Sequence, residues 1–78
     1  MSSVQEKVTK IIADQLGADV STITPETDIA NDLGADSLDI AELMIAFEEN
    51  FNIDINESEA QNIATVGDVL KYIEKATA

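Results

Sequence analysis

The chain has 78 residues, with 16 acidic side chains, four lysines and a net charge of −12, and it contains no cysteine, histidine or arginine. This length predicts one small domain, residues 1–78, whose core supplies only a few kcal/mol of net stability. The missing residue types exclude disulfides, thiolate nucleophiles, zinc–thiolate sites and the usual general base, so we do not expect an enzyme. The acidic charge repels nucleic acid and anionic membranes and attracts basic protein surfaces.

The first predicted element is an amphipathic helix over residues 3–16, followed by Gly17 as its C-cap. Its apolar residues recur on one helical face: Val4, Val8, Ile11, Ile12 and Leu16. A long connection follows to about residue 36. Because Ile23, Ile29 and Leu33 punctuate this connection, we expect it to pack on the core, with a short helical turn near residues 28–33.

A second helix is predicted over residues 37–50 and a short third helix over residues 57–62. Thr65, with Asp68 three residues on, predicts the start of a last helix. The buried stripe of that helix contains Val66, Val69, Leu70 and Ile73, with Tyr72 at its edge. The predicted fold class is therefore all-α: a small up-and-down bundle of three main helices plus one short helix, with a long first loop.

The stretch Leu33–Asp39 places a serine where a turn meets a helix. Gly34 allows a positive φ at little steric cost, and Asp36 with Asp39 has a spacing close to that of a capping box. Free backbone N–H groups and the positive end of the helix dipole favour a phosphate attached to Ser37. Taken alone, the segment also fits a simpler interpretation, in which Ser37 only caps the helix and contributes ~1 kcal/mol.

The second helix has two apolar faces when its residues are placed at about 100° steps. The larger face, which we assign to the core, contains Ile40, Leu43, Met44 and Phe47. The smaller face contains Leu38, Ala41 and Ile45 and is edged by carboxylates. A surface helix buries only one stripe, so we expect the smaller face to be at least partly exposed. The alternatives are scattered surface apolar residues or a second core covered by the long loop.

The acidic residues are concentrated in the middle of the chain. Residues 28–59 contain ten acidic side chains and no basic one, whereas all four lysines lie outside this segment. An apolar strip edged by such acids is typical of a docking surface, because the strip supplies close packing and the acids steer basic partners. The other interpretation is that the acidity only aids solubility.

The segment Asp32-Leu-Gly-Ala-Asp-Ser-Leu-Asp39 resembles that of acyl carrier proteins of the discrete type used in fatty acid synthesis, and the similarity extends over nearly the whole chain. This resemblance implies that Ser37 carries 4′-phosphopantetheine, donated by coenzyme A through a phosphopantetheinyl transferase. The thiol of that arm would hold acyl chains as thioesters. Ser37 would then be an acceptor residue, with no catalytic residue and no metal site in the chain. Carriers of polyketide synthesis are close relatives and remain an alternative.

The resemblance also implies a docking surface for fatty acid synthesis enzymes and a pocket for the acyl chain. We assign the docking surface to Asp36, Leu38, Asp39, Ala41, Glu42, Ile45, Glu48 and Glu49. We assign the pocket to Ile29, Phe47, Ile55, Ala60, Ile63 and Tyr72, positions that fit a core equally well. Ile40 and Phe47 are larger than is usual for such carriers, which leaves the pocket depth open.

We expect a monomer that neither inserts into membranes nor binds nucleic acid, located in the cytoplasm, or in an organelle stroma or matrix if a transit segment was removed. The acidic residues also suggest three other classes of protein. A calcium-binding loop starting at Asp28 fails on spacing, because Ala30 and Leu33 occupy a ligand position and the glycine position. An acidic protein-interaction module with loose divalent-ion binding remains an alternative, whereas a hydrolase with paired carboxylates requires a cleft that so short a chain seldom forms.

Overall fold

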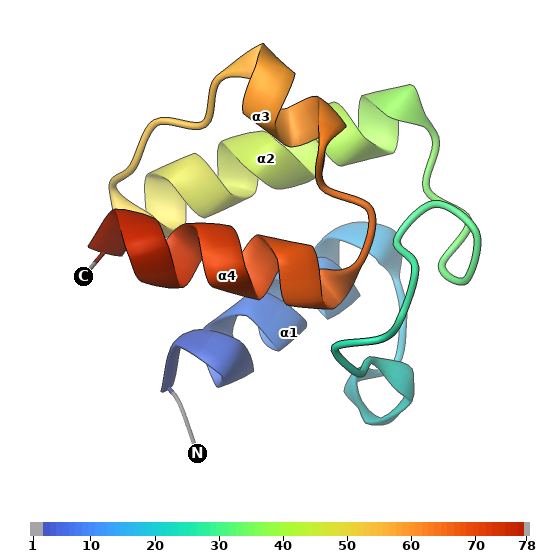
Figure 1. Cartoon of the computed structure of the whole chain (residues 1–78). Coiled ribbons are helices and arrows are strands. Elements are labelled where there is room, and N and C mark those ends of the chain that lie inside the picture. The colour runs from blue at the N-terminus through green and yellow to red at the C-terminus, as the bar shows by residue number, and fades with distance from the viewer. Residues whose placement is uncertain (1–2, 78) are drawn as a thin grey trace.

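The computed structural model describes residues 3–77, which form four α-helices and one short 3₁₀ helix (Figure 1). The bounds are α1 (Ser3–Leu16), η1 (Val20–Thr22), α2 (Ser37–Phe51), α3 (Glu57–Gln61) and α4 (Val66–Thr77). The predicted all-α class, with three main helices and a short one, is confirmed. α1 has its predicted bounds, α2 ends one residue later and α3 one residue earlier than predicted, and η1 was not predicted. None of the helices in the described part of the chain is long and apolar enough to cross a membrane.

The core is formed where α1 packs against both α2 and α4 (Figure 1). Its members are the predicted stripes of these helices, joined by apolar residues of the first loop. Phe47, Ile12, Ile29, Leu43 and Ile73 are its largest fully buried side chains. The burial of Ile29 confirms that the long loop packs on the core. Burial of such side chains is the main stabilising contribution in so small a domain.

The loop contains two local structures between α1 and α2. Asp19 caps η1, because its Oδ1 accepts a hydrogen bond from Ser21 N at 2.9 Å. A single turn follows at residues 28–33, where Asp32 N donates to Asp28 O at 2.8 Å. The helical turn expected in this region is therefore present as one hydrogen-bonded turn that does not continue into a helix.

The same loop is joined to the start of α4 by backbone hydrogen bonds. Ile29 N donates to Ala64 O at 3.0 Å, and Val66 N donates to Thr27 O at 3.0 Å. Gly67 N donates to Pro25 O at 2.9 Å, and a Cβ at position 67 would lie 3.0 Å from that oxygen. The loop carbonyls thus satisfy N–H groups that a helix start leaves without intrahelical partners. Glycine at position 67 permits this close approach.

A reciprocal cap completes the start of α4. Asp68 N donates to Thr65 Oγ1 at 3.2 Å, while Asp68 Oδ2 accepts from Thr65 N at 3.1 Å and from Ala64 N at 3.0 Å. The predicted pairing of Thr65 with Asp68 is confirmed. The hydrogen bonds from Ala64 N and Thr65 N lower the pKa of Asp68 below its ordinary value of 3.8.

We predict that Asp68→Asn destabilises the protein in a pH-dependent way. Because the pKa of Asp68 is lowered by folding, the charged form stabilises the folded state above the ordinary value of 3.8, and this contribution is lost as the pH falls below it. The free energies of unfolding of the wild-type protein and of Asp68→Asn, measured in urea, will therefore differ by about 1 kcal/mol at pH 7. The two values will converge under strongly acidic conditions. The control is Asp14→Asn on the exposed face of α1; an equal, pH-independent loss in both variants would contradict the prediction.

Candidate functional site at the start of α2

The start of α2 is fixed by a cap and by a buried anchor. Asp36 is the N-cap: its Oδ1 accepts from Asp39 N at 2.9 Å, and Asp36 N donates to Asp39 Oδ2 at 3.2 Å. This capping box is the one that the sequence predicts. Gly34 has φ +70°, and the buried Ala35 next to it donates its N–H to Ile29 O at 3.3 Å. The turn is therefore held on the core immediately before the helix begins.

Ser37 is the first residue of α2, and its side chain is exposed. Because Asp36 performs the capping, the Ser37 hydroxyl is not needed for it, and no hydrogen bond among residues 3–77 involves Ser37 Oγ. The simpler interpretation, in which Ser37 is the cap, is thus not what the structure shows. An accessible oxygen beside the N–H groups of a helix start suits an attached phosphate.

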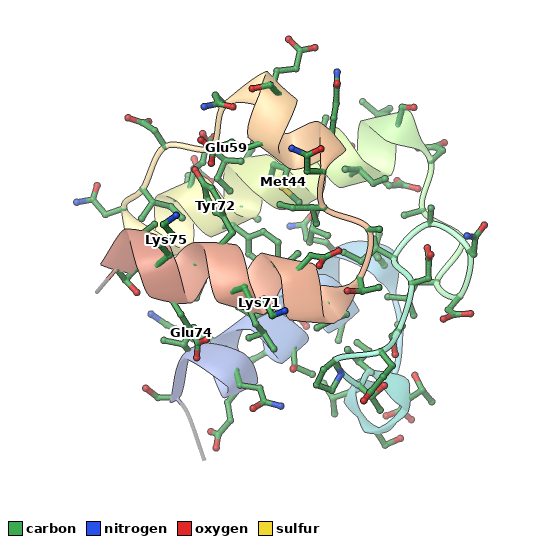
Figure 2. All side chains as sticks on the ribbon, in the orientation of Figure 1. Met44, Glu59, Lys71, Tyr72, Glu74 and Lys75 are labelled. Carbon is green, nitrogen blue, oxygen red and sulfur yellow. The ribbon has the colours of Figure 1, made fainter. Side chains whose placement is uncertain are left out.

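A groove of about 400 Å³ lies between α2 and α3 and includes Ser37 at its edge. Its α2 side is lined by Ile40, Ala41 and Met44, and its α3 side by Glu57, Ala60 and Gln61, with Ile63 just beyond. Figure 2 shows Met44 beneath α3. The apolar surface of the groove and its polar α3 edge suit an apolar chain carried on a polar tether.

A second cavity of about 230 Å³ lies between the end of the first loop and the α3–α4 connection. Its residues come from the loop turn, from Ile40 of α2 and from the segment after α3: Asp28, Ile29, Ala30, Asn31, Ile40, Ile63 and Ala64. The two cavities therefore have residues of α2 and of the α3–α4 connection in common.

The structure distributes the six residues predicted to line the pocket over several places. Ala60 and Ile63 line the groove beside Ser37, and Ile29 with Ile63 lines the second cavity. Phe47 is fully buried in the core, and Ile55 is a partly buried residue packed against it. Sequence reasoning left Ile40, Ala41 and Met44 out of the pocket assignment, although it named the size of Ile40 as bearing on the pocket depth. Their spacing of three, four and seven residues from Ser37 was the available signal, because such residues share a helical face.

Tyr72 lies on the other side of α3, where it lines a separate groove with Glu59 and Lys75 (Figure 2). Hydrogen bonding to the Glu59 carboxylate, partial burial and nearby negative charges raise the pKa of Tyr72 to about 12. The Tyr72 hydroxyl has a single hydrogen, which it donates to Asp54 O at 2.9 Å, so the Glu59 carboxylate is an alternative acceptor for that same hydrogen. Tyr72 therefore ties α4 to the loop before α3.

The smaller apolar face of α2 is exposed, as the sequence predicts. Leu38 is 67% exposed and Ile45 is 52% exposed, and Ala41 between them is also exposed. We call these three residues the α2 strip. Of the acidic residues assigned to the docking surface, Asp36, Glu42 and Glu49 are exposed, and Asp39 and Glu48 are half-buried. The loop does not cover the strip, so the alternative of a second core is wrong.

Glu48 accepts a hydrogen bond from the backbone after α2, which its position on the helix did not predict. Its Oε2 accepts a hydrogen bond from Ile55 N at 2.8 Å and so holds the loop between α2 and α3. A carboxylate that accepts a backbone N–H bond of this kind stabilises the fold more than a solvated one. Glu48 therefore differs from Glu49, its exposed neighbour.

Comparisons with known proteins agree with this geometry. The family described as phosphopantetheine attachment site matches residues 6–73. A structure from Mycobacterium tuberculosis described as an acyl carrier protein superposes with a TM-score of 0.88 at 36% identity, over 94% of this chain and 97% of that one. The acyl carrier protein of Enterococcus faecalis gives 0.80 at 33% identity, over 94% and 92%. A doublet acyl carrier protein from prodigiosin biosynthesis gives 0.80 at 27% identity, over 94% of this chain but 35% of that longer one.

The chain belongs to the phosphopantetheine attachment family. Within that family it is an acyl carrier protein, which carries a covalent 4′-phosphopantetheine arm. The residues at the start of α2 fit such an arm, because an exposed hydroxyl at a capped helix start opens onto an apolar groove. When bound, the arm supplies the thiol that a chain without cysteine lacks.

We predict that Glu48→Ala loosens the loop between α2 and α3, because it leaves Ile55 N without its acceptor. The expected loss of stability is about 1 to 2 kcal/mol, with faster amide exchange at Ile55 measured by NMR. The matched control is Glu49→Ala, which removes the same charge from an exposed position. Equal exchange rates at Ile55 in both variants would show that the Glu48 bond does not hold this loop.

Proposed function

We propose that Ser37 is the attachment point of the arm, and that the protein delivers acyl intermediates, held as thioesters, to the enzymes of fatty acid synthesis. The observation that carries this proposal is the exposed Ser37 hydroxyl, which is free of capping and lies at the edge of the groove between α2 and α3. Nothing in the immediate surroundings activates the hydroxyl, so the transferase must supply the base. This agrees with the role of a carrier that performs no chemistry of its own.

The groove beside Ser37 is the proposed shelter for the acyl chain. Ile40, Met44 and Ile63 provide its apolar surface, and each methylene group moved from water onto such a surface contributes up to about 0.8 kcal/mol. Of the positions first assigned to the pocket, Ala60 and Ile63 contact this space directly. Phe47 lies in the core, where its side chain limits how deeply the helices admit a guest.

The α2 strip is the proposed docking surface for partner enzymes. Leu38 and Ile45 supply exposed apolar area, and Asp36, Asp39, Glu42, Glu48 and Glu49 surround them with negative charge. A partner with a basic rim around an apolar patch is complementary to this arrangement. The strip begins one residue after Ser37, so the arm lies at the edge of the surface that a docked enzyme contacts.

Phosphopantetheine transfer is predicted to occur at Ser37 and nowhere else in the chain. Incubation with coenzyme A and a phosphopantetheinyl transferase will raise the intact mass by one phosphopantetheinyl group, and Ser37→Ala will abolish the gain. Ser58→Ala, at an exposed serine of α3, is the matched control and will be labelled fully. An unchanged mass of the wild-type protein, or labelling that persists in Ser37→Ala, contradicts the assignment.

Substitutions in and around the α2 strip are predicted to weaken the binding of partner enzymes without changing the fold. Ile45→Ala and Glu42→Lys will each lower kcat/KM of a fatty acid condensing enzyme for the acylated carrier by about tenfold, the equivalent of about 1.4 kcal/mol of docking energy. Added salt will lower the wild-type value, because it screens the acidic surface.

Two matched variants control for general effects. Val20→Ala truncates an apolar side chain with the same 52% exposure as Ile45, and Glu6→Lys makes the same charge change on α1. Both are expected to retain wild-type kcat/KM. If they lose as much as Ile45→Ala and Glu42→Lys, the strip is not the interface. If the condensing enzyme does not elongate the acyl chain on the wild-type carrier at all, the carrier serves another pathway, such as polyketide synthesis.

A further inference from the structure

A single peptide unit before α3 is held from two helices. Its carbonyl, Asp54 O, accepts a hydrogen bond from the Tyr72 hydroxyl of α4 at 2.9 Å, and its N–H, at Ile55, donates to Glu48 Oε2 of α2 at 2.8 Å. Because a peptide unit is planar and stiff, displacing its carbonyl also displaces its N–H. Hydrogen bonds in such a chain also polarise and strengthen one another. We call this arrangement the Asp54–Ile55 clamp.

The clamp matters because α3 has little other support. None of the five residues of α3, all of which the structure describes, is buried. A helix of this length is not stable in isolation, since it forms too few hydrogen bonds to offset the cost of its first turn. The position of α3 therefore depends on the bonds that fix its two ends, and the clamp fixes the first of them.

The Tyr72 hydroxyl has a second acceptor within α3 itself. Glu59 and Tyr72 line the same groove and lie on the same side of α4 (Figure 2). The pKa of Tyr72 is raised chiefly by hydrogen bonding to the Glu59 carboxylate, which agrees with this placement. A carboxylate is a stronger acceptor than a peptide carbonyl, but Glu59 Oε1 already accepts from Asn56 Nδ2 at 2.9 Å. One hydroxyl hydrogen serves one acceptor at a time, so the two acceptors compete.

We propose that Tyr72 is a two-position switch for the segment before α3: its hydroxyl donates either to Asp54 O, which closes the clamp, or to the Glu59 carboxylate, which opens it. In the closed position the peptide unit is tied to both α2 and α4. In the open position α3 stays tied to α4 through Glu59, while the loop before it is held only by Glu48. The switch thus frees the loop without detaching α3, and it operates without the arm or a partner enzyme.

The test measures the exchange of the Ile55 N–H with solvent by NMR in the unmodified chain. Tyr72→Phe removes the bond to Asp54 O and will speed this exchange on the order of fivefold, the equivalent of one ordinary hydrogen bond, although the hydroxyl does not bond to the Ile55 N–H itself. Glu59→Gln will slow the exchange about twofold, because an uncharged amide is the weaker competitor for the hydroxyl. Gln also keeps an oxygen for Asn56 Nδ2.

Two measurements separate the switch from general effects. The N–H of the buried Leu43 reports global stability in each sample, and the Ile55 rate is taken relative to it. Glu74→Gln removes the same charge on the opposite side of α4 (Figure 2) and will leave the relative rate unchanged. The inference is overturned if Tyr72→Phe leaves the relative rate unchanged, or if Glu59→Gln raises it or only equals Glu74→Gln. If Tyr72→Phe fails to fold, the direction of the Glu59→Gln change decides.

Discussion

The backbone pairing between the first loop and the start of α4 determines where the carrier site lies. Carbonyl groups at Pro25 and Thr27 accept N–H bonds from the first turn of α4, and Ile29 N binds Ala64 O. Ile29 is thereby held in the core, and its own carbonyl accepts the N–H of Ala35, two residues before Ser37. A loop of this length carries a large conformational entropy. These bonds, together with the burial of Ile29, offset that entropy and keep the start of α2 in one place.

The acidic side chains of the middle segment fall into two groups with different roles. Asp36 caps α2 and Glu48 holds the loop before α3, each by accepting a backbone N–H bond, and Asp68 does the same beyond that segment at α4. These carboxylates offset part of the repulsion that a net charge of −12 imposes on a small core. Glu42 and Glu49 are exposed beside the α2 strip, so their charge is directed toward solvent, where it is available to steer the basic partner that we propose.

The starts of α2 and α4 were predictable from the sequence because each cap joins residues only three positions apart. It predicted the core stripes well because helical periodicity separates buried from exposed faces. The cavities were not predictable in this way. Ile40 and Met44 lie at the edge of the core face, and only the position of α3, a helix of five residues, decides that they border a groove. The bond from Glu48 to Ile55 likewise depends on how the chain turns after α2.

Ala41 belongs to both surfaces of α2 for which we propose a function. It is part of the exposed strip between Leu38 and Ile45, and it also lines the groove beside Ser37. Under the proposed function, a partner seated on the strip contacts the rim of the groove that shelters the acyl chain. A partner that binds more tightly to one conformation of this rim shifts the conformational equilibrium of the protein toward that conformation. Under the proposed function, docking on α2 and release of the chain from the groove are therefore linked through the same helix, with local opening of a small core as the means of release.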